Sequence, residues 1–95
     1  MSYLVVTTLD LAADTDRPFV ERELAALGLL NCLVDSRNES HVLPQNVYAG
    51  VFDGATAHGL RRQVADEIRR LVGHFRVEAR VLVSVGGHWS LRHAA

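Results

Sequence analysis

The sequence contains no lysine, a single cysteine and few aromatic residues, and these shortages exclude several classes of protein. The one cysteine, Cys32, cannot form an internal disulfide, so we expect a reducing, cytoplasmic compartment rather than a disulfide-stapled secreted domain. No apolar run approaches the roughly 20 residues needed to cross a bilayer, so we expect no membrane partner. Because aromatic side chains are scarce, the core must consist mainly of valine, leucine and alanine.

What is present fits a folded globular protein. The 95 residues have the length of one domain, and we expect a single domain over residues 1–95. Hydrophobic residues make up 48% and charged residues 22%, which is not the composition of a disordered chain. A net charge of −1 argues against a general polyanion binder. All ten basic residues are arginine, the better phosphate ligand, although a compositional preference of the genome is the simpler explanation.

Apolar runs and turn signals predict the element order βαββαβ. Strands are expected at residues 3–8, 29–34, 47–52 and 77–85, with an irregular loop at 36–46 and a short C-terminal edge strand at 88–91. The first helix is expected to begin at Thr15 or Asp16 and to end at Gly28. The second is expected to begin at Asp53 or Thr56 and to end at Gly73.

This order predicts an α+β fold of the ferredoxin-like class. In such a two-layer sandwich, one antiparallel sheet carries both helices on the same face, because strand–helix–strand crossovers are right-handed almost without exception. The opposite face would be bare. In a chain this rich in valine and leucine, we expect that face to meet a second copy, which predicts a homodimer.

The sequence carries no phosphate-loop, dinucleotide-binding, zinc-protease or C-x-x-C motif. Asp10 is the most informative single residue, because it lies where the first strand is expected to end. A carboxylate there can hold Mg²⁺ together with water and a substrate phosphate, and a two-fold dimer would bring two copies of it together. The alternative is that Asp10 only caps a turn.

A second group of polar residues follows the second strand: Asp35, Arg37, Asn38 and His41. Histidine can act as a general acid or base, and arginine can hold a phosphate. The alternative is a solvated loop with no chemical role.

Three segments carry a family resemblance. YLVVTTLD, which ends in Asp10, resembles the opening strand of the small CRISPR-associated endoribonuclease and integration-scaffold family and its VapD-like relatives. CLVDSRNESHVLPQNVYAGVFDG resembles the GhoS type of antitoxin endoribonuclease, and VLVSVGGHWS resembles the ending of small proteins of the same superfamily. The resemblance implies a ferredoxin-like dimer that binds or cuts RNA or DNA, with Asp10 in a catalytic site that holds Mg²⁺ or Mn²⁺. Arg17 falls where the family has a basic residue at the start of its first helix.

The leading hypothesis is therefore a homodimeric, metal-dependent endoribonuclease or an antitoxin-type RNA-binding protein with a toxin or another protein as partner. Asp10 and His41 are its candidate catalytic residues, and Asp10 is its candidate metal ligand. Arg17 and Arg37 are its candidates for binding the nucleic-acid backbone. Two alternatives stay open: a non-catalytic dimeric scaffold and a dimer that senses a small molecule.

Overall fold

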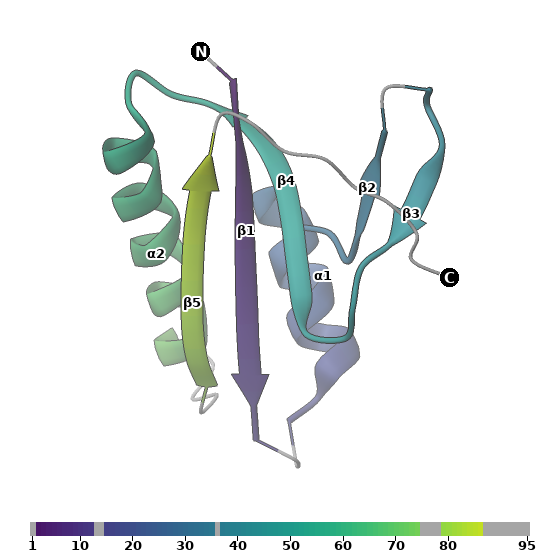
Figure 1. The fold of residues 1–95 in the computed structure, drawn as a ribbon. Coiled ribbons are helices and arrows are strands. Elements are labelled where there is room, and N and C mark those ends of the chain that lie inside the picture. Colours follow the sequence, from purple (N-terminus) through teal and green to yellow (C-terminus); the bar gives the residue numbers. More distant parts are fainter. Residues whose placement is uncertain (1, 13–14, 36, 75–78, 87–95) are drawn as a thin grey trace.

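The computed structural model describes residues 2–12, 15–35, 37–74 and 79–86. They form an α+β fold with two helices, a three-stranded antiparallel sheet and a separate two-stranded antiparallel sheet (Figure 1). The elements are β1 (Ser2–Leu11), α1 (Arg17–Leu27), β2 (Cys32–Val34), β3 (Ser40–Val42), β4 (Val47–Asp53), α2 (Ala57–His74) and β5 (Ala79–Gly86). The edge strand expected at 88–91 lies outside the described residues.

The first strand is the centre of the main sheet. The strand order of this sheet is β4-β1-β5, and both β4 and β5 run antiparallel to β1. Since side chains alternate between the faces of a strand, the odd-numbered residues of β1 share one face and the even-numbered residues the other. Val5, Thr7 and Leu9 on the odd face are fully buried, whereas Asp10 on the even face is exposed.

The main hydrophobic core lies between the odd face of β1 and the two helices. It joins Val5 and Leu9 of the sheet to Val20 and Leu24 of α1. A single stripe of α2 at helical spacing completes it: Leu60, Val64 and Ile68. Both helices therefore cover the same sheet face, as the sequence predicts. Neither described helix is long and apolar enough to span a membrane.

The boundaries of α1 confirm the local sequence signals. Asp16 is the N-cap, and its side chain accepts a hydrogen bond from the backbone N–H of Phe19 at 3.2 Å. Pro18 lies in the first turn, where the missing N–H has no cost. Gly28 ends the helix at φ 97°, in the left-handed region that favours glycine.

Two predictions about the middle of the chain are wrong. Residues 36–46 are not simply a loop, because Ser40–Val42 forms β3 and pairs with Cys32–Val34. The predicted second strand contributes to the main sheet only through one bridge, between Leu30 and Ala49. Beyond that bridge the chain turns away as the β2–β3 hairpin, so the main sheet has three described strands instead of four.

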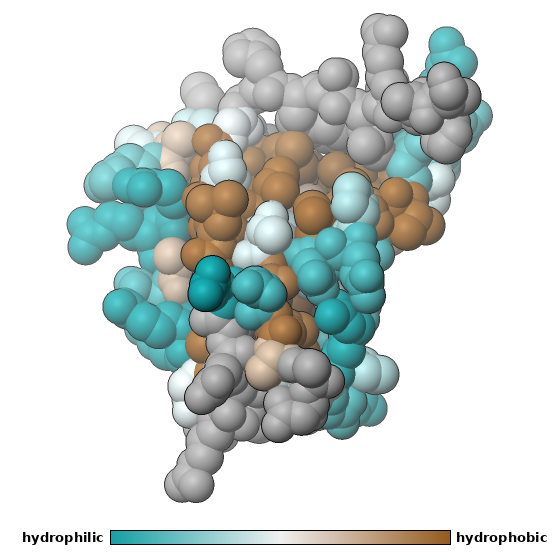
Figure 2. Space-filling model, turned by 60° about the horizontal axis from the view of Figure 1, so that its bottom comes forward, coloured by the Kyte–Doolittle hydropathy of each residue, from teal (hydrophilic) through white to brown (hydrophobic). Residues whose placement is uncertain are grey.

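The hairpin also corrects the expectation of a bare second face. Leu33 of β2 and the neighbouring Leu43 pack with Leu4 and Ala49 in a second buried cluster. The rest of that face stays open, as the exposed fractions of Val51 (58%) and Leu82 (66%) show. Figure 2 shows hydrophobic side chains gathered in the middle of the surface, between hydrophilic flanks. We call the even-numbered side of β1, with its neighbours on β4 and β5, the open sheet face.

Candidate functional site

The turn of the β2–β3 hairpin is organised by one carboxylate. Asp35 Oδ1 accepts hydrogen bonds from the backbone N–H groups of Arg37 and Glu39, both at 2.9 Å. Asn38 supports the turn with φ 64°, a conformation that asparagine tolerates better than most residues. An aspartate that bonds to N–H groups a few residues ahead is a common way to stabilise a turn. The sequence therefore forms a defined hairpin where the composition alone indicates a loop.

The same carboxylate holds His41. Asp35 Oδ2 lies 2.8 Å from His41 Nε2, and the two side chains are 23% and 27% exposed. The hydrogen bond from His41, followed by the backbone N–H of Glu39, keeps the pKa of Asp35 below its ordinary value of 3.8. Asp35 is therefore ionised at neutral pH and orients the imidazole ring of His41. Such a pair can move a proton to or from a bound molecule.

Metal ligands are also present in this turn. One ligand atom from each of Asp35, Glu39 and His41 lies within 4.8 Å of the other two. Two carboxylates and one imidazole suit a divalent ion such as Mn²⁺. Both oxygens of Asp35 are already engaged, however, by two backbone N–H groups and by His41. A metal would have to displace these bonds, so the arrangement favours an acid–base pair over a metal centre.

Asp10 lies elsewhere. It is the penultimate residue of β1, exposed on the open sheet face and directly opposite Arg80 of β5 in the strand register. The C-terminal end of β1 and the β2–β3 turn lie at opposite ends of the molecule (Figure 1). One chain therefore does not bring the two predicted catalytic residues together. Within the described residues, Asp10 belongs to no group of three potential metal ligands, and the cation of Arg80 opposes a second positive charge nearby.

Arg17 has a structural environment of its own. It is the first residue of α1, and its guanidinium donates a hydrogen bond to the side-chain oxygen of Asn46. It also bonds to the phenol of Tyr48, which is 2% exposed. Burial raises the pKa of Tyr48, and the negative charge of Glu21 raises it further, while Arg17 opposes the shift. Through these contacts Arg17 connects the start of α1 to the chain at the start of β4. Arg37, in contrast, is exposed in the hairpin turn.

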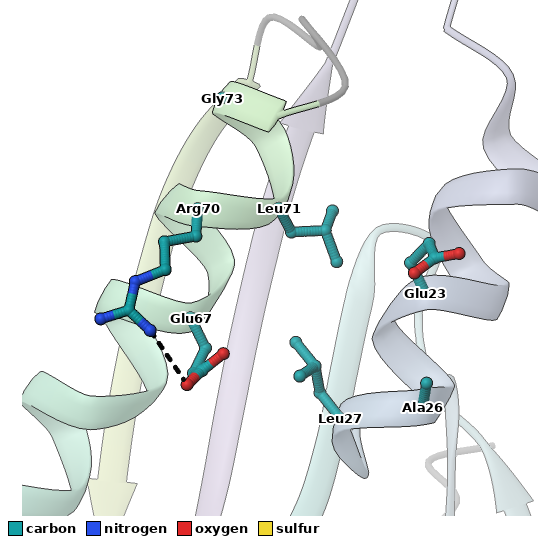
Figure 3. Close-up of a pocket in the computed structure, with 7 residues that line it drawn as sticks. All are labelled: Glu23, Ala26, Leu27, Glu67, Arg70, Leu71 and Gly73. Atoms are coloured by element: carbon teal, nitrogen blue, oxygen red, sulfur yellow. Dashed lines mark hydrogen bonds and ion pairs between the residues drawn. The ribbon is translucent and has the colours of Figure 1, made fainter.

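The two helices form a further hollow, with a volume of about 770 Å³. Leu27 of α1 and Leu71 of α2 point toward each other across it, with Glu23 on one side and the Arg70–Glu67 ion pair, 3.4 Å apart, on the other (Figure 3). It offers apolar contact, and the lining residues that the structure describes include no histidine or cysteine.

Comparisons of this chain with protein-family models, with curated proteins and with solved structures return no match. The resemblance carried by YLVVTTLD and the central segment stays a prediction. Sequence reasoning grouped Asp35, Arg37, Asn38 and His41 as one polar cluster but assigned Glu39 no role. In the hairpin register His41 lies opposite Leu33, and Asp35 comes two residues after Leu33, so the two side chains lie on the same side of the hairpin.

Proposed function

We propose that the protein binds single-stranded RNA and cleaves it with the Asp35–His41 pair as its acid–base group. The observation that carries the proposal is the 2.8 Å contact between Asp35 Oδ2 and His41 Nε2 in a partly exposed turn. Asp35 fixes the ring through Nε2, which leaves Nδ1 as the atom that exchanges a proton with the substrate. The exposed Arg37 in the same turn supplies a cation for the phosphate.

The chemistry needs only groups that RNA and this turn contain. His41 accepts the proton of a ribose 2′-hydroxyl, and the resulting oxygen attacks the adjacent phosphorus. The bond from phosphorus to the 5′-oxygen breaks, and that oxygen takes a proton from solvent water as it leaves, while His41 returns its own proton to the solvent. The products are a 2′,3′-cyclic phosphate and a new 5′-hydroxyl. The negative charge that develops on the phosphate is stabilised by Arg37.

The strand order is compatible with the fold of the superfamily that the sequence resembles. The main sheet runs β5-β1-β4, and the Leu30–Ala49 bridge adds the chain before β2 beside β4. We therefore propose that the domain is a small ferredoxin-like sandwich in which the second strand has become a hairpin. The topology supports a fold with many activities, so it carries no weight for the reaction itself.

A rival mechanism places the chemistry at Asp10. In a homodimer built on the open sheet face, two Asp10 carboxylates would meet near the two-fold axis and hold Mg²⁺ or Mn²⁺. The resemblance supports this mechanism, and the exposure of Asp10 on that face is compatible with it. The neighbouring Arg80 counts against it, because its charge opposes that of a metal.

A second candidate function is a dimeric scaffold without catalysis. It is favoured by the open sheet face, where Val51 and Leu82 expose 58% and 66% of their surface. Exposed aliphatic residues on the two outer strands of one sheet face are typical of a surface that another protein covers.

The test is a cleavage assay on single-stranded RNA with wild-type protein, His41→Gln and Asp10→Asn, each with Mg²⁺, with Mn²⁺ and with chelator. We expect cleavage that survives the chelator and Asp10→Asn but falls about 10²–10⁴-fold in His41→Gln. A 2′-deoxy substitution in the RNA should block cleavage at that site. Metal-dependent cleavage lost only in Asp10→Asn would establish the rival mechanism. No cleavage by a folded wild-type dimer would favour the scaffold.

A further inference from the structure

The outer edge of β5 is a surface that the proposed RNA chemistry does not use. Ala79–Gly86 ends the described sheet, and its register pairs all lie on one side, with residues 4–11 of β1. In an edge strand, every second N–H and C=O group points away from the sheet and is available to another strand. Within the described part of the chain, no strand pairs with that side.

A groove runs beside this edge, between β5 and α2. Its volume is about 480 Å³. One wall is formed by residues of α2: Arg61, Ala65, Asp66, Arg69 and Val72. The floor is formed by Val81 and Val83 of β5. The floor of the groove is therefore apolar, and its helical wall carries two arginines and one carboxylate, so the wall has a surplus of positive charge.

The charge of α2 decides which partner fits. The helix carries four arginines and two carboxylates, since only Asp66 and Glu67 offset its cations. Asp66 pairs with Arg69 at 2.6 Å, whereas Arg61 contacts only the ring nitrogen of His58 among its described partners, at 2.9 Å. A second copy added at this edge would bring its own α2 alongside, and like charges would repel. An acidic partner is attracted instead.

The spacing of the arginines fits an extended chain. Arg61 and Arg69 are eight residues apart, which is about 12 Å along a helix. In a strand, side chains four residues apart point to the same face and lie about 13 Å apart. A strand added to β5 would thus place two acidic side chains against these arginines and an apolar side chain, midway between them, over Val81 and Val83.

We propose that the groove between α2 and β5 binds an extended peptide that pairs with the free edge of β5. The peptide carries two acidic residues four positions apart, with an apolar residue midway. Its backbone supplies the hydrogen bonds, and its alternate side chains supply the selectivity. Single-stranded RNA fits less well, because the lining residues that the structure describes include no aromatic ring on which a base would stack.

The probe is a fluorescein-labelled peptide of about seven residues, with threonine on the outward positions and glutamate, valine and glutamate on the three groove-facing positions. Fluorescence anisotropy measures its affinity for the full chain, and amide hydrogen exchange reports protection of residues 79–86. We expect binding, together with slower exchange in β5. A peptide with lysine in place of glutamate, and one N-methylated at alternate residues, should each bind at least ~10-fold more weakly.

The variant pair Arg61→Glu with Arg69→Glu should weaken binding at least ~10-fold, because two attractions become repulsions. The matched control is Arg62→Glu with Arg70→Glu, which makes the same change in charge on the same helix outside the groove. We expect the control pair to bind within about threefold of the wild type at 0.15 M salt, where screening is effective beyond about 8 Å.

Equal loss in both variant pairs, or equal binding of the glutamate and lysine peptides, would overturn the proposal. No binding at the highest soluble peptide concentration would also overturn it. If β5 exchange slows with protein concentration alone, the edge is occupied by a second copy and the proposal is wrong. Competition by RNA that is lost in Arg61→Glu with Arg69→Glu would identify a nucleic-acid groove instead and would overturn the peptide assignment.

Discussion

At the scale of single residues, Asp35 stabilises the hairpin in two ways: it accepts backbone hydrogen bonds in the turn, and its charge lies beside His41. A substitution can separate the two contributions. Asp35→Asn keeps an oxygen that accepts from the N–H groups of Arg37 and Glu39, but it removes the charge beside His41. The variant therefore tests the ionic part of the contact, whereas Asp35→Ala would remove the turn as well.

Because the pKa of Asp35 is lowered on folding, its ionised form favours the folded state. That contribution is fully present above the ordinary value of 3.8 and is lost as the pH falls through the lower folded value. We expect Asp35→Asn to be less stable than wild type at neutral pH and the difference to shrink below pH 3.8. Urea unfolding followed by circular dichroism across this range measures it. A difference that does not change with pH would contradict this prediction.

Thr7 is the opposite case, a polar group without a described partner. Its side chain is fully buried on the helix-facing side of β1, and its hydroxyl makes no hydrogen bond to any residue that the structure describes. Thr7→Val keeps the β-branched shape and removes the desolvation cost of the hydroxyl. We expect the free energy of unfolding to rise by about 1 kcal/mol.

The control for Thr7 is Thr8→Val, which makes the same change one residue later on the open sheet face. Thr8 is only half-buried, so we expect a change within about 0.5 kcal/mol. If the two substitutions have the same effect on stability, the prediction is wrong: the Thr7 hydroxyl then forms a hydrogen bond in solution, and its burial does not destabilise the fold.

At the scale of elements, the end of α1 rests directly on β4. A Cβ atom at Gly50 would lie 2.1 Å from the backbone oxygen of Gly28, a distance that requires the backbone to move. Gly28 itself needs its left-handed φ to end the helix. The missing side chain of Gly50 thus lets the backbone at the end of α1 come closer to β4 than any other residue at position 50 would allow.

We expect Gly50→Ala to lower the free energy of unfolding by about 2–3 kcal/mol, because overpacking forces the helix end away from the strand. Gly73→Ala is the matched control: nothing lies within 4 Å of its Cβ position, and alanine favours a helix. That variant should be as stable as wild type or slightly more stable. Thermal unfolding of both proteins provides the measurement. Equal unfolding midpoints for the two variants would contradict the prediction, because position 50 would then accommodate a Cβ atom without loss of stability.

The helix boundaries were predictable because their causes are local. Asp16, Pro18 and Gly28 each act within a turn of their own position, so their meaning can be read from the sequence. The short strand Ser40–Val42 was not predictable, since three residues around a histidine carry too little alternation and their stability comes from pairing with β2. The contact of Asp35 with His41 depends on that pairing. The sequence therefore shows the members of the site but not their geometry.

At the scale of the whole molecule, the open sheet face predicts self-association. Leu82 is 66% exposed there, so Leu82→Asp should leave the monomer folded while it places a charge in the proposed dimer interface. We expect wild-type protein to sediment as a dimer and Leu82→Asp as a monomer. Val42→Asp, at a β3 residue that is 82% exposed, is the control and should stay dimeric. A monomeric wild type at all concentrations would contradict the prediction.

The position of β1 between β4 and β5 has a consequence for how the protein is made. The central strand β1 is synthesised before its two partner strands, because β4 begins at Val47 and β5 at Ala79. Until both have been synthesised, the nascent chain carries an apolar strand with two unsatisfied edges. Pairing over such long sequence separations is slow, and aggregation competes with it during that interval. We therefore expect chaperones to bind the nascent chain more than the completed protein.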